Sequence, residues 1–166
     1  MLVRYLYSFF VAVLLVTFVG VGIAAFYKGP KQPEYPIEVE THYAVDKPTT
    51  ESAEMRQKRM QYEKNSREYI KQNETYNKNV STVAIVASLI ILVISITFIG
   101  KIVYLSDGLL MGGLFTLVYA VIRGFNAGDE MFRFIVVTIG LIVAIFLGYW
   151  KFVRTVTLQH PKKKLN

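Results

Sequence analysis

The side chains that could do chemistry are few and lie far apart in this sequence. The only two histidines are His42 and His160, and the chain contains no cysteine. A zinc or thiolate site needs several such ligands at short spacing. No HExxH, glycine-rich phosphate loop or GxSxG motif occurs. A Ser–Lys or Asp dyad would need an ionisable group inside an apolar segment, and there is none. The sequence therefore predicts no enzyme activity, no cofactor and no metal.

Four apolar runs organise the chain: Tyr5–Phe26, Val80–Gly100, Gly108–Ile122 and Phe134–Trp150. Each is apolar on nearly every helical face, whereas a soluble core helix shows one apolar stripe. About 20 apolar residues cross a bilayer as a helix. The first two runs reach that length, and the last two reach it with flanking basic residues whose charges extend to the interface. The sequence predicts an all-α integral membrane protein with four transmembrane helices, although the third run could instead be re-entrant.

The predicted segments follow from these runs. The first transmembrane helix covers 1–27, and we expect an uncleaved signal anchor because its apolar run exceeds that of a typical signal peptide. Residues Ser106, Asp107 and Gly108 predict a turn, with Ser106 capping the third span. The remaining segments are a linker over 28–50, an extramembrane amphipathic helix over 51–79, transmembrane helices over 80–105, 106–124 and 131–155, a loop over 125–130, and a basic tail over 156–166.

The polar segment between the first two runs divides into a linker and a helix. Residues 28–36 contain three prolines and one glycine, which favours extended chain. Residues 37–45 alternate as in a strand, and an extended linker is favoured there over a strand that adds to a partner's sheet. Residues 51–79 contain no proline or glycine and are rich in helix formers. We expect this helix to continue into the second transmembrane helix and to reach about 43 Å outside the bilayer.

A heptad ridge is the sharpest pattern in the polar helix. Met55, Tyr62, Tyr69 and Tyr76 fall seven residues apart. Such a repeat keeps one face of a helix against a partner helix, and tyrosine rings suit protein–protein contacts. The intervening d-like positions are polar, so the ridge is half a coiled-coil signature. It predicts either a protein partner or self-association, against the alternative of a solvated helix whose tyrosines rest on the chain's own linker.

Small residues recur at four-residue spacing in all four apolar runs. In lipid, helices associate through the close backbone approach that small side chains permit. The pattern predicts packing within the four-helix bundle, with homo-oligomerisation as the alternative. The predicted packing positions are Gly108 and Gly112 on the third span, and Gly140, Ala144 and Gly148 on the fourth.

The charged residues flank the apolar runs. The formal net charge is +7, but the basic residues do not line one soluble face, which argues against nucleic-acid binding. The lysines of the tail, Lys162, Lys163 and Lys164, are expected to meet lipid head groups. Asp129 and Glu130 lie between Arg123 and Arg133 in the chain, and a surface ion-pair cluster of these four is favoured over an ion site.

These patterns favour a non-enzymatic scaffold, assembly or accessory subunit that binds a membrane or surface partner through the heptad ridge. Four spans place both termini on one side, and the cytoplasmic side of the cell membrane is favoured. No small-molecule substrate is identified. A membrane enzyme ranks third, behind an oligomeric channel or transporter component, which would need a polar seam through Ser88, Ser95, Thr97 and Thr116.

Overall fold

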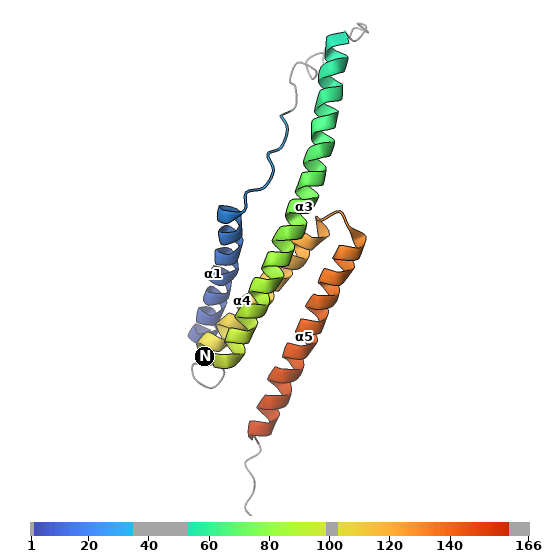
Figure 1. Cartoon of the computed structure of the whole chain (residues 1–166). Helices are drawn as coiled ribbons and strands as arrows, with labels where there is room; N and C mark the ends of the chain where they lie inside the picture. Colours follow the sequence, from blue (N-terminus) through green and yellow to red (C-terminus); the bar gives the residue numbers. More distant parts are fainter. Residues whose placement is uncertain (1, 35–52, 99–102, 160–166) are drawn as a thin grey trace, which may run out of the picture.

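The computed structural model describes residues 2–34, 53–98 and 103–159, and within these ranges the chain is all-helical (Figure 1). Each of the four described helices contains a stretch that is long and apolar enough to cross a membrane, which confirms the prediction of four such helices. The predicted extended segment over 37–45, both histidines and the tail lysines lie outside the described residues. The helices are α1 (Leu2–Phe26), α3 (Ala53–Phe98), α4 (Val103–Phe125) and α5 (Glu130–Gln159).

Helix α3 is a single helix of 46 residues whose character changes along its length. Its first half is rich in charged and amide side chains, and its second half, from Val80 onward, is apolar. No proline or glycine interrupts the sequence between Ala53 and Phe98, so nothing in the backbone ends the helix at the change of character. As a result α3 extends well beyond the other three helices (Figure 1).

Helix α4 lies at the centre of the bundle. It packs extensively against both α1 and α3 and meets α5 over a smaller area, whereas α1 and α3 touch each other little. Side chains from all four helices meet in one apolar cluster around the buried Ala84, Ala120 and Val136. The partly buried members of this cluster include Ile23 of α1 and Phe132 of α5. The other three helices are thus arranged around α4.

The contact between α4 and α1 depends on two glycines. A Cβ added to Gly108 would lie 3.1 Å from Val11, and one added to Gly112 would lie 2.9 Å from Leu15 and 3.3 Å from the Cα of Ala12. The absence of a side chain on α4 therefore lets the two backbones approach closely. Gly108 and Gly112 are the two positions that the GxxxG spacing singled out on this span.

A row of serines joins α3 to α4. Ser81, Ser88 and Ser95 are spaced by seven residues and are fully buried on the α4 side of α3. The Ser81 hydroxyl donates to the carbonyl of Ala120 at 2.8 Å. The hydroxyls of Ser95 and Ser106 each donate to the other residue's carbonyl, at 2.9 and 3.0 Å. These bonds cross between helices, so they fix the register of α3 on α4.

The turn predicted at Ser106–Gly108 is wrong. Helix α4 begins at Val103, so these residues lie inside its first two turns. Ser106 does not cap the helix, because its hydroxyl bonds to Ser95 on the neighbouring helix and its residue is 3% exposed. The predicted second span includes residues 103–105, but these residues belong to α4. Serine and aspartate favour turns because their side chains can hydrogen-bond to the nearby backbone. The Ser106 hydroxyl instead bonds to Ser95 on the neighbouring helix, so it does not stabilise a turn.

A short turn joins α4 to α5 and holds α5 at one end. Asp129 caps α5, since its Oδ1 accepts from the backbone N–H groups of Met131 and Phe132 at 3.0 and 3.2 Å. Gly128 adopts a φ of 72°, which favours glycine, and a Cβ there would collide with the carboxylate of Glu74 on α3. The turn therefore lies directly against α3.

The small residues of α5 differ in their surroundings. A Cβ on Gly140 would meet Val121 of α4 at 3.6 Å, whereas Gly148 has nothing within 4 Å and Ala144 is exposed. Helix α5 diverges from the other helices toward its carboxyl end (Figure 1). Of the three positions predicted on this helix, only Gly140 lies against a neighbouring helix.

Replacing a glycine by leucine should lower the stability of the bundle where the glycine is packed against another helix, and not where it faces open space. We expect Gly112→Leu to destabilise the bundle by about 1–3 kcal/mol, because α1 must move to admit the side chain. Gly148→Leu is the matched control, since its new side chain enters open space and gains helix propensity. Unfolding in detergent, followed by circular dichroism, would measure both. Equal stability of the two variants would contradict the close approach of α1 and α4.

Candidate functional site

The two surfaces with the most distinctive chemistry both involve α3. We call residues 53–75 of α3 the arm, because they project beyond the other helices (Figure 1). At the base of the arm, polar and aromatic side chains from α3, from α4, from the start of the linker and from the α4–α5 turn meet. We call this group the collar, and it consists of Tyr27, Tyr76, Asn77, Lys78, Asn79, Tyr119, Arg123 and Asp129.

An aromatic stack joins the start of the linker to the base of the arm. The rings of Tyr27 and Tyr76 are nearly parallel, with an interplanar angle of 13° and centroids 5.1 Å apart. Asn79 donates from Nδ2 to the Tyr27 hydroxyl at 2.9 Å. Gly29 lies so close that a Cβ there would be 3.3 Å from the Tyr76 ring. The chain leaving α1 is thus held against α3 at the first residues of the linker.

Arg123 connects α4 to the base of the arm. Its NH1 group donates to Oδ1 of Asn77 at 3.0 Å, and its Nε donates to the hydroxyl of Tyr119 at 3.2 Å. Its guanidinium lies 5.5 Å from the ring centroid of Tyr119 and 6.0 Å from that of Tyr76. Both rings present their negative faces to the cation. Asn77 is only 3% exposed, so its amide depends on this bond and on its donation to the carbonyl of Asn73.

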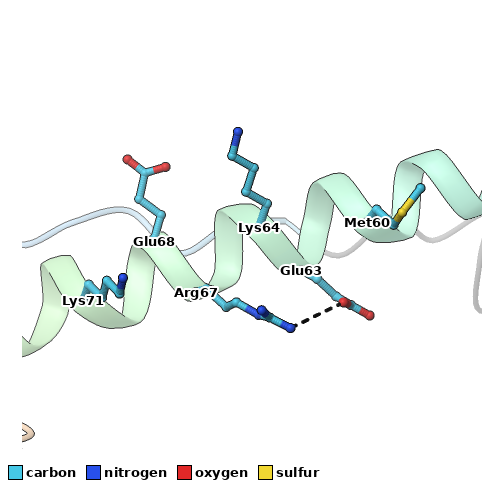
Figure 2. Close-up of a pocket in the computed structure, with 6 residues that line it drawn as sticks. All are labelled: Met60, Glu63, Lys64, Arg67, Glu68 and Lys71. Carbon is cyan, nitrogen blue, oxygen red and sulfur yellow. Dashed lines mark ion pairs between the residues drawn. The ribbon is translucent and has the colours of Figure 1, made fainter.

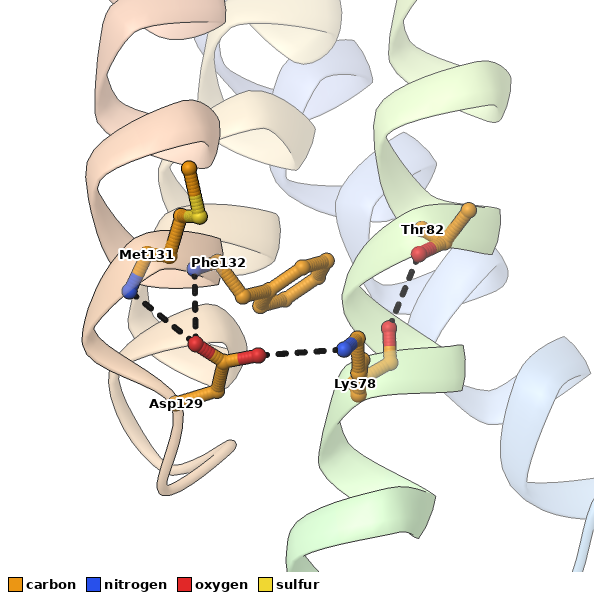
Figure 3. Close-up of polar contacts among 5 residues, drawn as sticks. All are labelled: Lys78, Thr82, Asp129, Met131 and Phe132. Carbon is orange, nitrogen blue, oxygen red and sulfur yellow. Dashed lines mark hydrogen bonds and ion pairs between the residues drawn. The ribbon is translucent and has the colours of Figure 1, made fainter.

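The third connection of the collar is an ion pair between α3 and the α4–α5 turn. Lys78 Nζ lies 3.2 Å from Oδ2 of Asp129 and 5.1 Å from the Phe132 ring centroid (Figure 3). The backbone N–H of Phe132 and the Lys78 ammonium lower the pKa of Asp129 below its usual value. The ion pair and the helix cap therefore both favour the ionised form of the Asp129 carboxylate. Their contribution to the stability of the fold is lost only as the pH falls through that lowered pKa.

The collar corrects one prediction about the charged residues at this end of the bundle. The predicted ion-pair cluster joins Asp129 and Glu130 to Arg123 and Arg133, but among the described residues the ion-pair partner of Asp129 is Lys78. Arg123 instead bonds to the neutral Asn77, and the Nε of Arg133 is buried without a hydrogen-bond partner in the described structure. Neither contact could be predicted from a local pattern, because Lys78 and Asp129 are 51 residues apart and Asn77 and Arg123 are 46 apart.

The predicted heptad ridge does not continue the buried side of α3, because the same seven-residue series reaches Val83 and Ile90, which are 52% and 55% exposed. Met55, Tyr62, Tyr69 and Tyr76 are all half-buried, whereas most of their neighbours on the arm are exposed. Of these four, Tyr76 packs on the chain's own linker, through Tyr27 and Gly29. The sequence left open that the tyrosines rest on the chain's own linker. This alternative holds for Tyr76, the ridge residue nearest the bundle.

The opposite face of the arm is charged and exposed. Figure 2 shows a shallow surface there that is lined by side chains of α3 alone. Glu63 and Arg67 form an ion pair at 4.0 Å, one helical turn apart, and both side chains remain largely exposed. Such pairs stabilise an isolated helix by a few tenths of a kcal/mol. The lining residues are Met60, Glu63, Lys64, Arg67, Glu68 and Lys71.

Three of the four hydroxyls that a polar seam would use are bonded to helix carbonyls. Ser95 bonds across to Ser106, while Thr97 and Thr116 each donate to the carbonyl four residues earlier in their own helix. Ser88 is fully buried between α3 and α4, and its Oγ has no hydrogen-bond partner in the described structure. Within the described ranges no group of three or more His, Asp or Glu side chains is placed to hold a metal ion.

Comparisons with known proteins give no assignment: no protein-family model, curated protein or solved structure matches this chain.

The Arg123–Asn77 bond can be tested by a double-mutant cycle. Arg123→Met should cost about 1–3 kcal/mol of stability, because it leaves a buried amide oxygen without its donor. Asn77→Leu should also destabilise, but the double variant should lose less than the sum of the two single losses, since neither partner is then left unpaired. Chemical unfolding in detergent measures each free energy. Strict additivity would show that the two side chains are not coupled.

Proposed function

We propose that this chain is a multi-pass membrane protein that acts as a scaffold or accessory subunit and presents its arm to a protein partner. The observation that carries the proposal is the collar, which joins the base of the arm to the bundle at three separate places. The stack on Tyr27, the bond from Arg123 and the ion pair with Asp129 approach α3 from different elements. A helix held in this way projects at a fixed angle, which suits a surface that must be offered to another molecule.

The membrane assignment rests on four helices with long apolar stretches and on side chains that face outward from the bundle. Phe18, Phe134 and Ile145 are each more than 60% exposed, which would be unfavourable in water. We propose that α1 is retained as a signal anchor and that both termini lie on the cytoplasmic side of the cell membrane. A helix of 46 residues is about 69 Å long, and about 30 Å of it would cross the hydrocarbon core.

The partner surface that we propose is the part of the ridge above the collar. Tyr76 packs on the linker. Met55, Tyr62 and Tyr69 are the ridge positions that lie on the arm, and all three are half-buried. Half-buried tyrosines offer large, rigid contact area together with a polar tip. A helix of a partner, or the same helix of a second copy, would match the seven-residue spacing.

An oligomeric channel or transporter component is the second candidate that the sequence raised. The described structure lends it little support, because Ser81, Ser95 and Ser106 bond between α3 and α4 in closed packing contacts. A hydroxyl that is used in this way is not available to line a water-filled path. We therefore favour the anchor and the arm over a pore.

Photo-crosslinking in native membranes tests the proposed partner surface. We expect a benzoylphenylalanine at Tyr69 to give a discrete adduct with a protein or with a second copy of the chain, because Tyr69 lies on the ridge. The same residue at Arg67, on the charged face, is the control and should give much less adduct. No adduct from either position, or equal yields from both, would contradict a partner bound on the ridge.

A further inference from the structure

An open groove between α1 and α3 lies next to the collar. Its volume is about 400 Å³, which is within the roughly 300–1,000 Å³ range of small-molecule sites. It exists because α1 and α3 both pack on α4 and touch each other little. The lining residues are Gly22, Ile23, Phe26 and Tyr27 from the end of α1 and its junction with the linker, and Asn79, Val80 and Val83 from α3.

The groove has an apolar end and a polar end. Val80 follows Asn79 directly on α3 and Val83 lies about one turn further along, and on the other wall Gly22 and Ile23 precede Tyr27. The polar atoms are thus gathered at the collar end, and the rest of the lining is hydrocarbon. None of the described residues that line the groove carries a carboxylate. A ligand that fits it must be an amphiphile with its chain directed toward the middle of the bundle.

The polar end offers hydrogen-bond donors. The Tyr27 hydroxyl accepts from Asn79, so its own proton remains available, and the Asn79 amide keeps a second N–H. Lys28 follows Tyr27 directly and is exposed, which places a cation next in the chain. Two neutral donors, with a lysine adjacent to one of them in the chain, suit the oxygens of a phosphate ester.

From this arrangement we propose that the groove binds one membrane phospholipid, with an acyl chain between α1 and α3 and its phosphate at Tyr27, Asn79 and Lys28. The position agrees with such a ligand, because the collar separates the charged arm from the apolar part of the bundle. In a bilayer, head groups and acyl chains meet at a boundary of the same kind, between polar and apolar surroundings. Bound there, the lipid would fill the space that α1 and α3 leave between them and would complete the base of the arm.

Native mass spectrometry of the full chain in detergent tests the site, with phosphatidylglycerol as the probe. We expect a one-to-one adduct with the native chain and its loss in Gly22→Leu. A Cβ at Gly22 meets nothing within 4 Å, so leucine there should fill the groove without disturbing the fold. Gly148→Leu is the matched control, because Gly148 is equally open and lies on α5. Retention of equal adduct by both variants would overturn the proposal.

Two further comparisons test the phosphate end. Lys28→Gln should weaken the adduct, and Lys31→Gln, an exposed lysine three residues further along the linker, should not. Diacylglycerol with the same acyl chains should bind less than phosphatidylglycerol, because it lacks the phosphate. Equal binding of the two lipids would overturn the assignment of the phosphate. A native chain that carries a protein in place of phospholipid after purification from its membranes would assign the groove to a partner and overturn the proposal.

Discussion

The hydrogen bond from Arg123 to Asn77 is the interaction on which the position of the arm depends most. It places the end of α4 against α3 at the point where α3 changes from polar to apolar. Asn77 is nearly fully buried, so its amide must be satisfied by protein groups at that level. Arg123 supplies a hydrogen-bond donor without bringing a carboxylate into the apolar region. Its guanidinium makes cation–π contacts with the rings of Tyr76 and Tyr119. The base of the arm is thereby fixed by groups that suit a boundary between water and hydrocarbon.

The bundle and the collar hold α3 in complementary ways. Below the collar, close packing and hydrogen bonds between helices hold the bundle together. Glycines on α4 allow α1 to approach closely, and serines on α3 donate hydrogen bonds to α4. At the collar, directional contacts from the linker, from α4 and from the α4–α5 turn converge on four consecutive residues, 76–79. Packing fixes the register of α3, and the convergent contacts fix its direction where it leaves the bundle. The proposed arm is the consequence of both.

The four apolar helices could be predicted from the sequence, because runs such as Tyr5–Phe26 are apolar on every face. The turn at Ser106–Gly108 could not be judged correctly, since the residue types favour a turn while the Ser106 hydroxyl finds its partner on another helix. The spacing of Gly140, Ala144 and Gly148 marks one helical face, but it carries no information on where α5 diverges from α4. The hydrogen bonds and the ion pair of the collar were beyond prediction, because they join residues about 50 positions apart through side chains that are ordinary at the end of a span.

The most direct test of the fixed arm is a distance distribution between the arm and the bundle. The chain has no cysteine, so spin labels at Lys64→Cys and Val118→Cys would be the only ones present. Both positions are exposed, one on the arm and one on α4. Double electron–electron resonance in lipid nanodiscs should give one narrow distribution, which should broaden when Arg123→Met and Tyr76→Ala are introduced together. A broad distribution in the otherwise native chain, or one that those substitutions leave unchanged, would contradict an arm held by the collar.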